Sequence, residues 1–168
     1  MEINISELEE LAKNGDVGAI YELGKAYFKG VGGVGVNYDK ARQYFEAAVE
    51  NGSKGANYYL GKIYYNGNGV QTNHLKAKEY FEKSSSADNV FSQYYLGKLY
   101  YWGDGVEKDY NKANEYKNSI LNKPIYASQE AGLQDFYSLT DFEETTKQYV
   151  NQLQERVNIE YKNLFGKE

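Results

Sequence analysis

The sequence predicts an all-α protein, an α/α solenoid of helix-turn-helix repeats closed by a long C-terminal capping helix. Three observations support this fold class. A Leu-Gly pair recurs at intervals of about 36 residues, a Gly-x-Gly turn follows each pair, and a Lys-Ala pair follows each turn. The chain of 168 residues contains 17 Gly and a single Pro. That composition fits short helices joined by glycine turns.

The first predicted element is a short helix that precedes the repeats. Ser6 and Glu9 have the spacing of a capping box, in which each side chain bonds the backbone N–H of the other residue. The helical pattern continues to Lys13. We assign residues 1–16 to an N-terminal capping helix, because it stands where a preceding repeat would place its second helix.

Each repeat then begins with a helix whose apolar and small residues recur at helical spacing. The Leu-Gly pair lies inside this helix, where Gly costs about 1 kcal/mol relative to Ala. The repetition of that cost predicts a close approach between helices that a Cβ atom would block. The pairs are Leu23-Gly24, Leu60-Gly61 and Leu96-Gly97, and the tyrosines that follow them are Tyr27, Tyr64 and Tyr100.

A glycine turn and a second helix complete each repeat. The first Gly of the turn can adopt the positive φ that ends a helix without strain. The polar residue three positions before the Lys-Ala pair is a suitable N-cap for the second helix. The turn glycines are Gly30, Gly67 and Gly103, the N-caps are Asn37, Asn73 and Asp109, and the Lys-Ala pairs begin at Lys40, Lys76 and Lys112.

The repeat pattern stops before Pro124, and we expect residues 123–168 to form C-terminal capping helices of the same domain. Thr140 and Glu143 form a second capping-box pattern, and apolar residues at helical spacing follow as far as Leu164. A helix there would cover the apolar face that the last repeat of a solenoid leaves exposed. The alternative is that this helix binds a partner or a second copy.

Composition excludes several classes of function. No Cys and a single His exclude thiol catalysis, Cys-ligated zinc and a multi-His metal site. The formal net charge of -5 argues against direct contact with nucleic acid. The mean hydropathy is -0.76, and no apolar run is long enough to span a membrane. The acidic N-terminal sequence does not match a signal peptide, so we expect a soluble cytoplasmic protein.

The sequence offers little that indicates catalysis, and we predict no catalytic residue, no cofactor and no metal. Gly30, Gly32 and Gly35 match Gly-x-Gly-x-x-Gly, but a nucleotide fingerprint follows a strand, whereas a helix precedes these glycines. His74 is expected in a solvated loop and has no serine motif beside it. We therefore do not expect a hydrolase.

A second row of residues runs beside the apolar face of each first helix. An aromatic residue, a lysine four positions later and an aromatic residue three further share one helix face. Tyr gives large contact area at low entropic cost, and Lys attracts acidic groups and aromatic rings. We call the following ten residues the Tyr–Lys stripe and predict that they bind a partner: Tyr21, Lys25, Phe28, Tyr58, Lys62, Tyr65, Tyr94, Lys98, Tyr101 and Trp102. The alternative is that the first tyrosine of each repeat packs between adjacent first helices.

The N-terminal end is a second candidate surface. Through residue 24 it carries one base, Lys13, and these acids: Glu2, Glu7, Glu9, Glu10, Asp16 and Glu22. An acidic edge attracts a basic partner, although a solvated helical cap has the same composition.

This repeated pattern resembles the Sel-one-like repeat (SLR) family, a relative of the tetratricopeptide repeats. The resemblance covers residues 17–122 in three copies and rests on the Leu-Gly, Tyr, Gly-x-Gly and Lys-Ala positions described above. It implies that the first helices line the concave surface of a superhelix, so that the Tyr–Lys stripe faces a groove. It also implies a non-enzymatic protein–protein interaction module.

Two roles within that class are open. The resemblance implies a small bacterial immunity or inhibitor protein that binds and neutralises a toxin, because stand-alone members of the family have such roles. The alternative is a scaffold or adaptor that binds an extended peptide in its concave groove. In either role the partner is another protein, with no direct contact to nucleic acid or membrane. The oligomeric state does not follow from the sequence.

Overall fold

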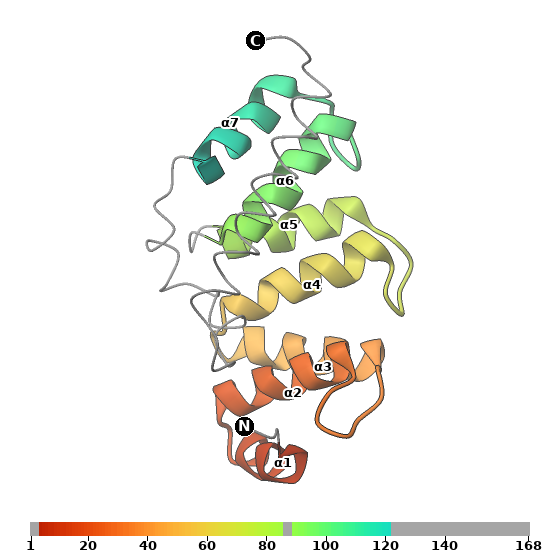
Figure 1. Ribbon diagram of the computed structural model, residues 1–168, viewed down its shortest axis with the longest axis vertical. Helices are drawn as coiled ribbons and strands as arrows, with labels where there is room; N and C mark the ends of the chain where they lie inside the picture. The colour runs from red at the N-terminus through yellow and green to blue at the C-terminus, as the bar shows by residue number, and fades with distance from the viewer. Residues whose placement is uncertain (1–3, 86–88, 122–168) are drawn as a thin grey trace.

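The computed structural model describes residues 4–85 and 89–121, and this part of the chain is all-helical. The helices stack in chain order along the long axis of the molecule (Figure 1). They are α1 (Ile5–Lys13), α2 (Val17–Lys29), α3 (Tyr38–Glu50), α4 (Gly55–Asn66), α5 (His74–Ser85), α6 (Val90–Trp102) and α7 (Tyr110–Leu121). The predicted all-α solenoid of helical repeats is confirmed.

The repeats are helix pairs that pack on their neighbours in the chain. Helices α2 and α3, α4 and α5, and α6 and α7 pack within the pairs, while α3 contacts α4 and α5 contacts α6 between them. Helix α1 packs against α2 at the N-terminal end. The elements expected within residues 123–168, including the Thr140–Glu143 capping box, lie outside the described residues.

The N-terminal helix has a different cap from the predicted one. Asn4 is the N-cap, and its side-chain oxygen accepts a hydrogen bond of 3.2 Å from the backbone N–H of Glu7. Ser6 therefore lies inside the first turn, and the predicted Ser6–Glu9 capping box is wrong. Asn is as good an N-cap as Ser, and it comes earlier in the chain. The predicted helix end at Lys13 is confirmed.

The glycine turns have the predicted conformation and an additional contact. Gly30, Gly67 and Gly103 end the first helices with φ of 70°, 71° and 74°. In the next two turns, Gly69 and Gly105 also have a positive φ of 68°. A Cβ on Gly69 would lie 3.1 Å from Tyr38 Cβ, and one on Gly105 would lie 2.7 Å from the Leu75 backbone nitrogen. Each of these turns thus packs against the start of the preceding repeat's second helix.

The N-caps of the second helices are confirmed in all three repeats. The side chains of Asn37, Asn73 and Asp109 accept hydrogen bonds of 2.9, 2.9 and 3.0 Å from the backbone N–H groups of Lys40, Lys76 and Lys112.

Replacing Asn73 with Ala should lower the free energy of unfolding by about 1 kcal/mol, because an N–H group of the first turn of α5 loses its acceptor. Urea denaturation of the full chain, followed by circular dichroism, measures this change. Asn73→Asp is the matched control, since the third repeat uses Asp at this position. An equal loss in both variants would contradict the capping role.

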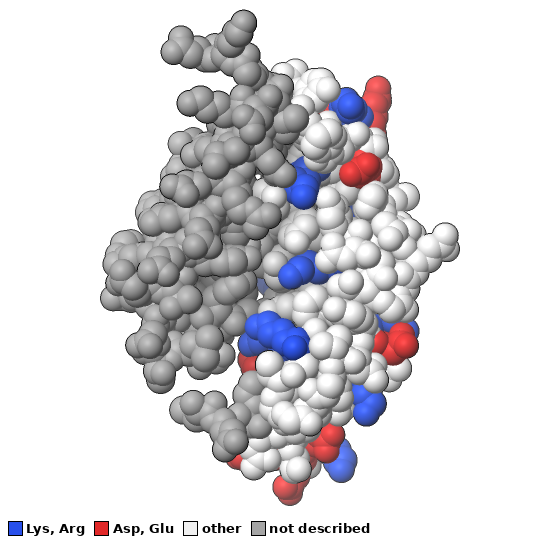
Figure 2. Space-filling model, turned by 45° about the vertical axis from the view of Figure 1, so that its right-hand side comes forward, with Lys and Arg blue, Asp and Glu red and all other residues white. Residues whose placement is uncertain are grey.

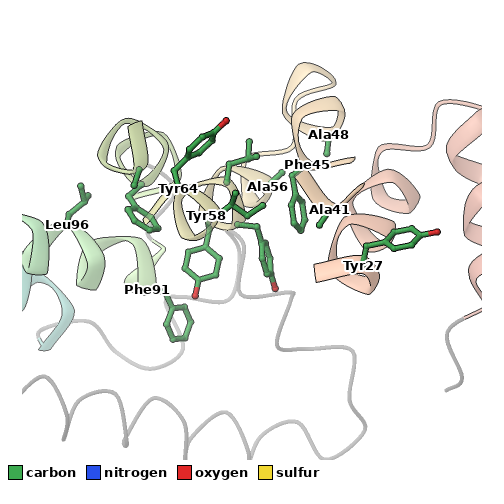
Figure 3. Packing of buried hydrophobic residues seen from close by; sticks show 14 of the residues in the cluster. Tyr27, Ala41, Phe45, Ala48, Ala56, Tyr58, Tyr64, Phe91 and Leu96 are labelled. Carbon is green, nitrogen blue, oxygen red and sulfur yellow. The ribbon is translucent and has the colours of Figure 1, made fainter. Parts of the chain in front are cut away.

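The predicted close approach is present at the Leu-Gly pairs of the first two repeats. A Cβ on Gly24 would lie 2.6 Å from a ring carbon of Phe45, and one on Gly61 would lie 2.5 Å from a ring carbon of Phe81. Both phenylalanine side chains are completely buried. Figure 3 shows Phe45 with Ala41, Ala48 and Ala56 at the junction between the first and second repeats. Gly24 and Gly61 therefore let the second helices of the first two repeats place a phenylalanine ring against the first helix of the same repeat.

The same two rings also join neighbouring repeats. Phe45 stacks on Tyr59 of the second repeat at 4.7 Å between ring centroids, and Phe81 stacks on Tyr95 of the third repeat at 4.7 Å. The equivalent position in the first repeat is Glu22. Helix α1 supplies no phenylalanine for a tyrosine to stack on, so this position is free to carry a charge.

Candidate functional site

Two lysines of the Tyr–Lys stripe, Lys62 and Lys98, each lie over aromatic rings of two successive repeats. The ammonium nitrogen of Lys62 lies 5.3 Å from the ring centroid of Phe28 in the first repeat and 5.6 Å from that of Tyr58 in its own repeat. Both distances suit cation–π attraction. The corresponding contacts of the third repeat join Lys98 to Tyr65 at 5.8 Å and to Tyr94 at 5.5 Å. The predicted stripe is therefore continuous across the repeat boundaries.

The first lysine of the stripe has a different environment. Lys25 lies over the Tyr21 ring at 5.4 Å and forms an ion pair of 2.8 Å with Glu22. Its side chain is buried, with 4% of the residue exposed. The ion pairs found within residues 4–85 and 89–121 involve neither Lys62 nor Lys98. Within the described part of the chain, a carboxylate thus pairs with the stripe lysine of the first repeat, whereas the stripe lysines of the next two repeats contact aromatic rings.

Burial and mutual repulsion act on the lysines at this surface. Burial lowers the pKa of Lys62, and the nearby charge of Lys29 lowers it further. Burial likewise lowers the pKa of Lys29, Lys25 adds to the effect, and Glu22 opposes it. Lys29 was not part of the predicted stripe, although it stands one helical turn after Lys25. An anionic group placed among these ammonium groups would reduce their mutual repulsion and offset the cost of desolvating their charges.

We call Lys25, Lys29, Lys62 and Lys98 the lysine row. These residues come from the first helix of each successive repeat, α2, α4 and α6. Figure 2 shows Lys and Arg side chains spaced along one side of the stack. A row of cations set among aromatic rings suits a ligand that offers both carboxylates and apolar groups.

In the first two repeats, the first tyrosine of the Tyr–Lys stripe packs toward the next repeat. Tyr21 meets Tyr59 at 6.1 Å, and Tyr58 meets Phe91 at 6.0 Å, where Figure 3 shows the two rings near each other. Tyr58 is buried. These contacts favour the alternative that such tyrosines pack between adjacent first helices, and binding by the same residues stays a prediction.

The last aromatic residue of each trio packs on the start of the second helix. Tyr65 lies 5.1 Å from the ring of His74, and Tyr101 lies 5.2 Å from the ring of Tyr110. His74 is thus the half-buried first residue of α5, and its predicted place in a solvated loop is wrong. Trp102 packs edge-on against Tyr101 at 4.9 Å and is 48% exposed.

A second set of lysine–tyrosine contacts was not predicted. Lys76, the lysine of a Lys-Ala pair, lies 4.2 Å from the Tyr64 ring centroid and donates a hydrogen bond of 2.9 Å to the Tyr64 hydroxyl. That hydrogen bond raises the pKa of Lys76. Tyr64 also stacks on Tyr80 at 5.7 Å. The corresponding lysines of the other repeats are Lys40 over Tyr27 and Lys112 over Tyr100. The recurrence of a Lys-Ala pair 12 or 13 residues after each of these tyrosines was the signal that could have revealed this pairing.

Neither a candidate metal site nor a candidate membrane span lies within the described residues. In residues 4–85 and 89–121, no three or more His, Asp or Glu side chains gather in a way that could hold a metal ion. Within the same ranges, no helix combines the length and apolar character needed to cross a bilayer.

Comparisons with known proteins agree with the repeat boundaries seen in the fold. The family model described as "Sel1 repeat" matches residues 17–53, 55–89 and 90–116. No curated protein matches the chain.

Two solved structures are similar to this chain. One is a Sel1 repeat protein from Oxalobacter formigenes, with a TM-score of 0.56, 28% identity, and coverage of 62% of this chain and 41% of that one. The other is c5321, a protective antigen of uropathogenic Escherichia coli with an SLR fold. Its TM-score is 0.65 at 24% identity, with coverage of 90% of this chain and 33% of that one. The matches thus span less than half the length of either structure.

Proposed function

The chain belongs to the Sel1 repeat family, a protein-interaction fold that is generally non-enzymatic, and on this basis we propose that it binds another protein through its Tyr–Lys stripe. The observation that carries the proposal is the lysine row set among aromatic rings. The ammonium group of Lys62 lies between the rings of Phe28 and Tyr58, which favour this position of its charge. A fixed and partly desolvated cation binds a carboxylate more strongly than a mobile surface lysine does.

The chemistry of the row indicates the kind of partner. A segment that carries Asp or Glu would find ammonium groups on successive repeats, and its apolar side chains would meet the aromatic rings between them. Trp102, nearly half exposed at the end of α6, offers a large aromatic surface at the margin of the same face. This favours the scaffold or adaptor role, in which the protein holds an acidic segment of its partner along the first helices.

The finer alternative is an immunity or inhibitor protein of a bacterial cytoplasm that neutralises a toxin. It is supported by the acidic N-terminal end, where Glu7 and Glu10 are exposed on α1. A basic toxin would be attracted to this end rather than to the lysine row. The two roles therefore require two different surfaces.

Charge reversal at the lysine row distinguishes these possibilities. A partner captured from native lysate is identified, purified and titrated against the full chain by calorimetry. The double variant Lys62→Glu, Lys98→Glu should weaken binding by about tenfold or more, because each change replaces an attraction with a repulsion. Lys54→Glu is the matched control, since Lys54 is exposed at the start of α4.

The other outcomes are equally informative. Unchanged affinity of the double variant would contradict binding at the stripe. Loss of affinity in Glu7→Lys, Glu10→Lys, with the lysine variants unaffected, would move the site to the acidic end and support the inhibitor role. Circular dichroism of each variant confirms that it is folded.

A further inference from the structure

The lysine row has little acidic compensation within the described part of the chain. Within residues 4–85 and 89–121, the ion pair that involves the lysine row is the one between Lys25 and Glu22. Lys62 is half-buried between two rings, and its burial and the nearby charge of Lys29 both lower its pKa. An acidic segment is the ligand that such a surface favours, and the remaining sequence contains one.

Residues 130–144 form the most one-sided acidic stretch of the sequence beyond the described residues. They contain no Lys or Arg and the following acids: Glu130, Asp135, Asp141, Glu143 and Glu144. Apolar residues alternate with these acids: Leu133, Phe136, Tyr137, Leu139 and Phe142. The composition is complementary to the Tyr–Lys stripe, since carboxylates match the lysine row and apolar side chains match the rings.

The chain can also deliver this segment to the stripe. Helix α7 ends at Leu121 and packs against α6, which carries Tyr94, Lys98 and Tyr101. The residues between Leu121 and Glu130 span up to about 30 Å when extended. A tethered ligand has an effective concentration of about 1 mM or more, so even a weak contact would be well populated.

We propose that residues 130–144 are an intramolecular ligand of the lysine row and compete with the protein partner for the Tyr–Lys stripe. This inference rests on the proposed function, because it names the element that regulates the same site. The partner then binds only by displacing the chain's own acidic segment. Its apparent affinity is reduced by the fraction of molecules in which the stripe is occupied.

Zero-length cross-linking of the full chain with a carbodiimide tests the contact directly. Mass spectrometry should find amide links between lysines of the row, above all Lys62 or Lys98, and acids of residues 130–144. The yield of these links within a monomer should not change when the protein is diluted. Links that occur only in covalent dimers, and that disappear on dilution, would overturn the proposal in favour of binding by a second copy.

Binding of a fluorescein-labelled decaglutamate peptide tests the competition. The variant Asp135→Asn, Asp141→Asn, Glu143→Gln, Glu144→Gln should bind this probe about tenfold more tightly than the unmodified chain, because the intramolecular competitor has lost most of its charge. The matched control is Glu155→Gln, Glu160→Gln, Glu168→Gln, which removes later acids of the same region. The control should bind the probe as the unmodified chain does.

The results separate this inference from the proposed function. Equal probe affinity in the unmodified chain and the neutralised variant, with that affinity lost in Lys62→Glu, would overturn the intramolecular ligand and leave the proposed function standing. Intramolecular cross-links without probe binding by either protein would support the intramolecular contact and contradict the proposed function.

Discussion

Replacing Phe81 with Ala is expected to lower the free energy of unfolding by about 4 kcal/mol, the largest effect of any single change considered for this chain. Phe81 is completely buried, and its ring is seated against Gly61. It also stacks on Tyr95 of the next repeat. The substitution therefore leaves a cavity at the junction of two repeats and removes an aromatic pair. Urea denaturation of the full chain, followed by circular dichroism, measures the loss.

Leu75→Ala on the same helix is the control for this prediction. Leu75 is 54% exposed, so its loss should change the free energy of unfolding by no more than about 0.5 kcal/mol. A change of similar size in both variants would contradict the assignment of Phe81 to the junction. A broadened or biphasic transition in Phe81→Ala would be consistent with the loss of coupling between repeats, since repeat proteins are stabilised by nearest-neighbour interfaces.

Replacing Gly61 with Ala is expected to destabilise the protein by about 2 kcal/mol, even though Ala is the better helix former by about 1 kcal/mol. The added Cβ would lie 2.5 Å from a ring carbon of Phe81, closer than real Cβ contacts allow. The ring cannot retreat, because Tyr95 lies against it on the side of the next repeat. The sign of the change in the free energy of unfolding is informative, because a Gly-to-Ala change in a helix without this contact would raise the stability.

Two further variants locate the cause of that effect. In the background of Phe81→Leu the same glycine substitution should cost at least about 1 kcal/mol less, because the clashing ring is gone and the two sites are coupled. Gly35→Ala is the control, since a Cβ at Gly35 would meet nothing within 4 Å. Additive effects of the Gly61 and Phe81 changes would contradict the proposed clash.

Much of the fold could be predicted because its signals are local. The N-cap role of Asn73 depends on a residue three positions away, and the positive φ of Gly67 depends on its own lack of a side chain. The close approach at Gly61 was predictable because a costly helical glycine recurs in every repeat. The wrong prediction of Ser6 as the N-cap of α1 shows the limit of such reasoning, since Asn4 and Ser6 are both suitable N-cap residue types and Asn4 is the one used.

The candidate site was predictable only in part. Helical periodicity placed Lys62 and Lys98 on one face, but it did not show that each lysine lies over a ring of the preceding repeat. Periodicity also did not show that Tyr58 is buried against Phe91. The stripe is therefore both a packing surface and a candidate binding surface, and residue spacing cannot separate these two roles.

The repeat, the helix pairs, the glycine turns and the N-caps of the second helices follow from the sequence alone, because their signals recur along the chain or depend on neighbours within one helical turn. Which side chains meet across repeats is seen only in the tertiary structure, where Phe81 stacks on Tyr95 and Lys62 lies over Phe28. The same holds for the effect of the Lys29 charge on the pKa of Lys62. Those contacts depend on the shift and rotation from one repeat to the next, which the packing of all the buried rings sets together. For that reason the sequence predicted which residue types form the site, but it did not predict which rings and charges surround each lysine.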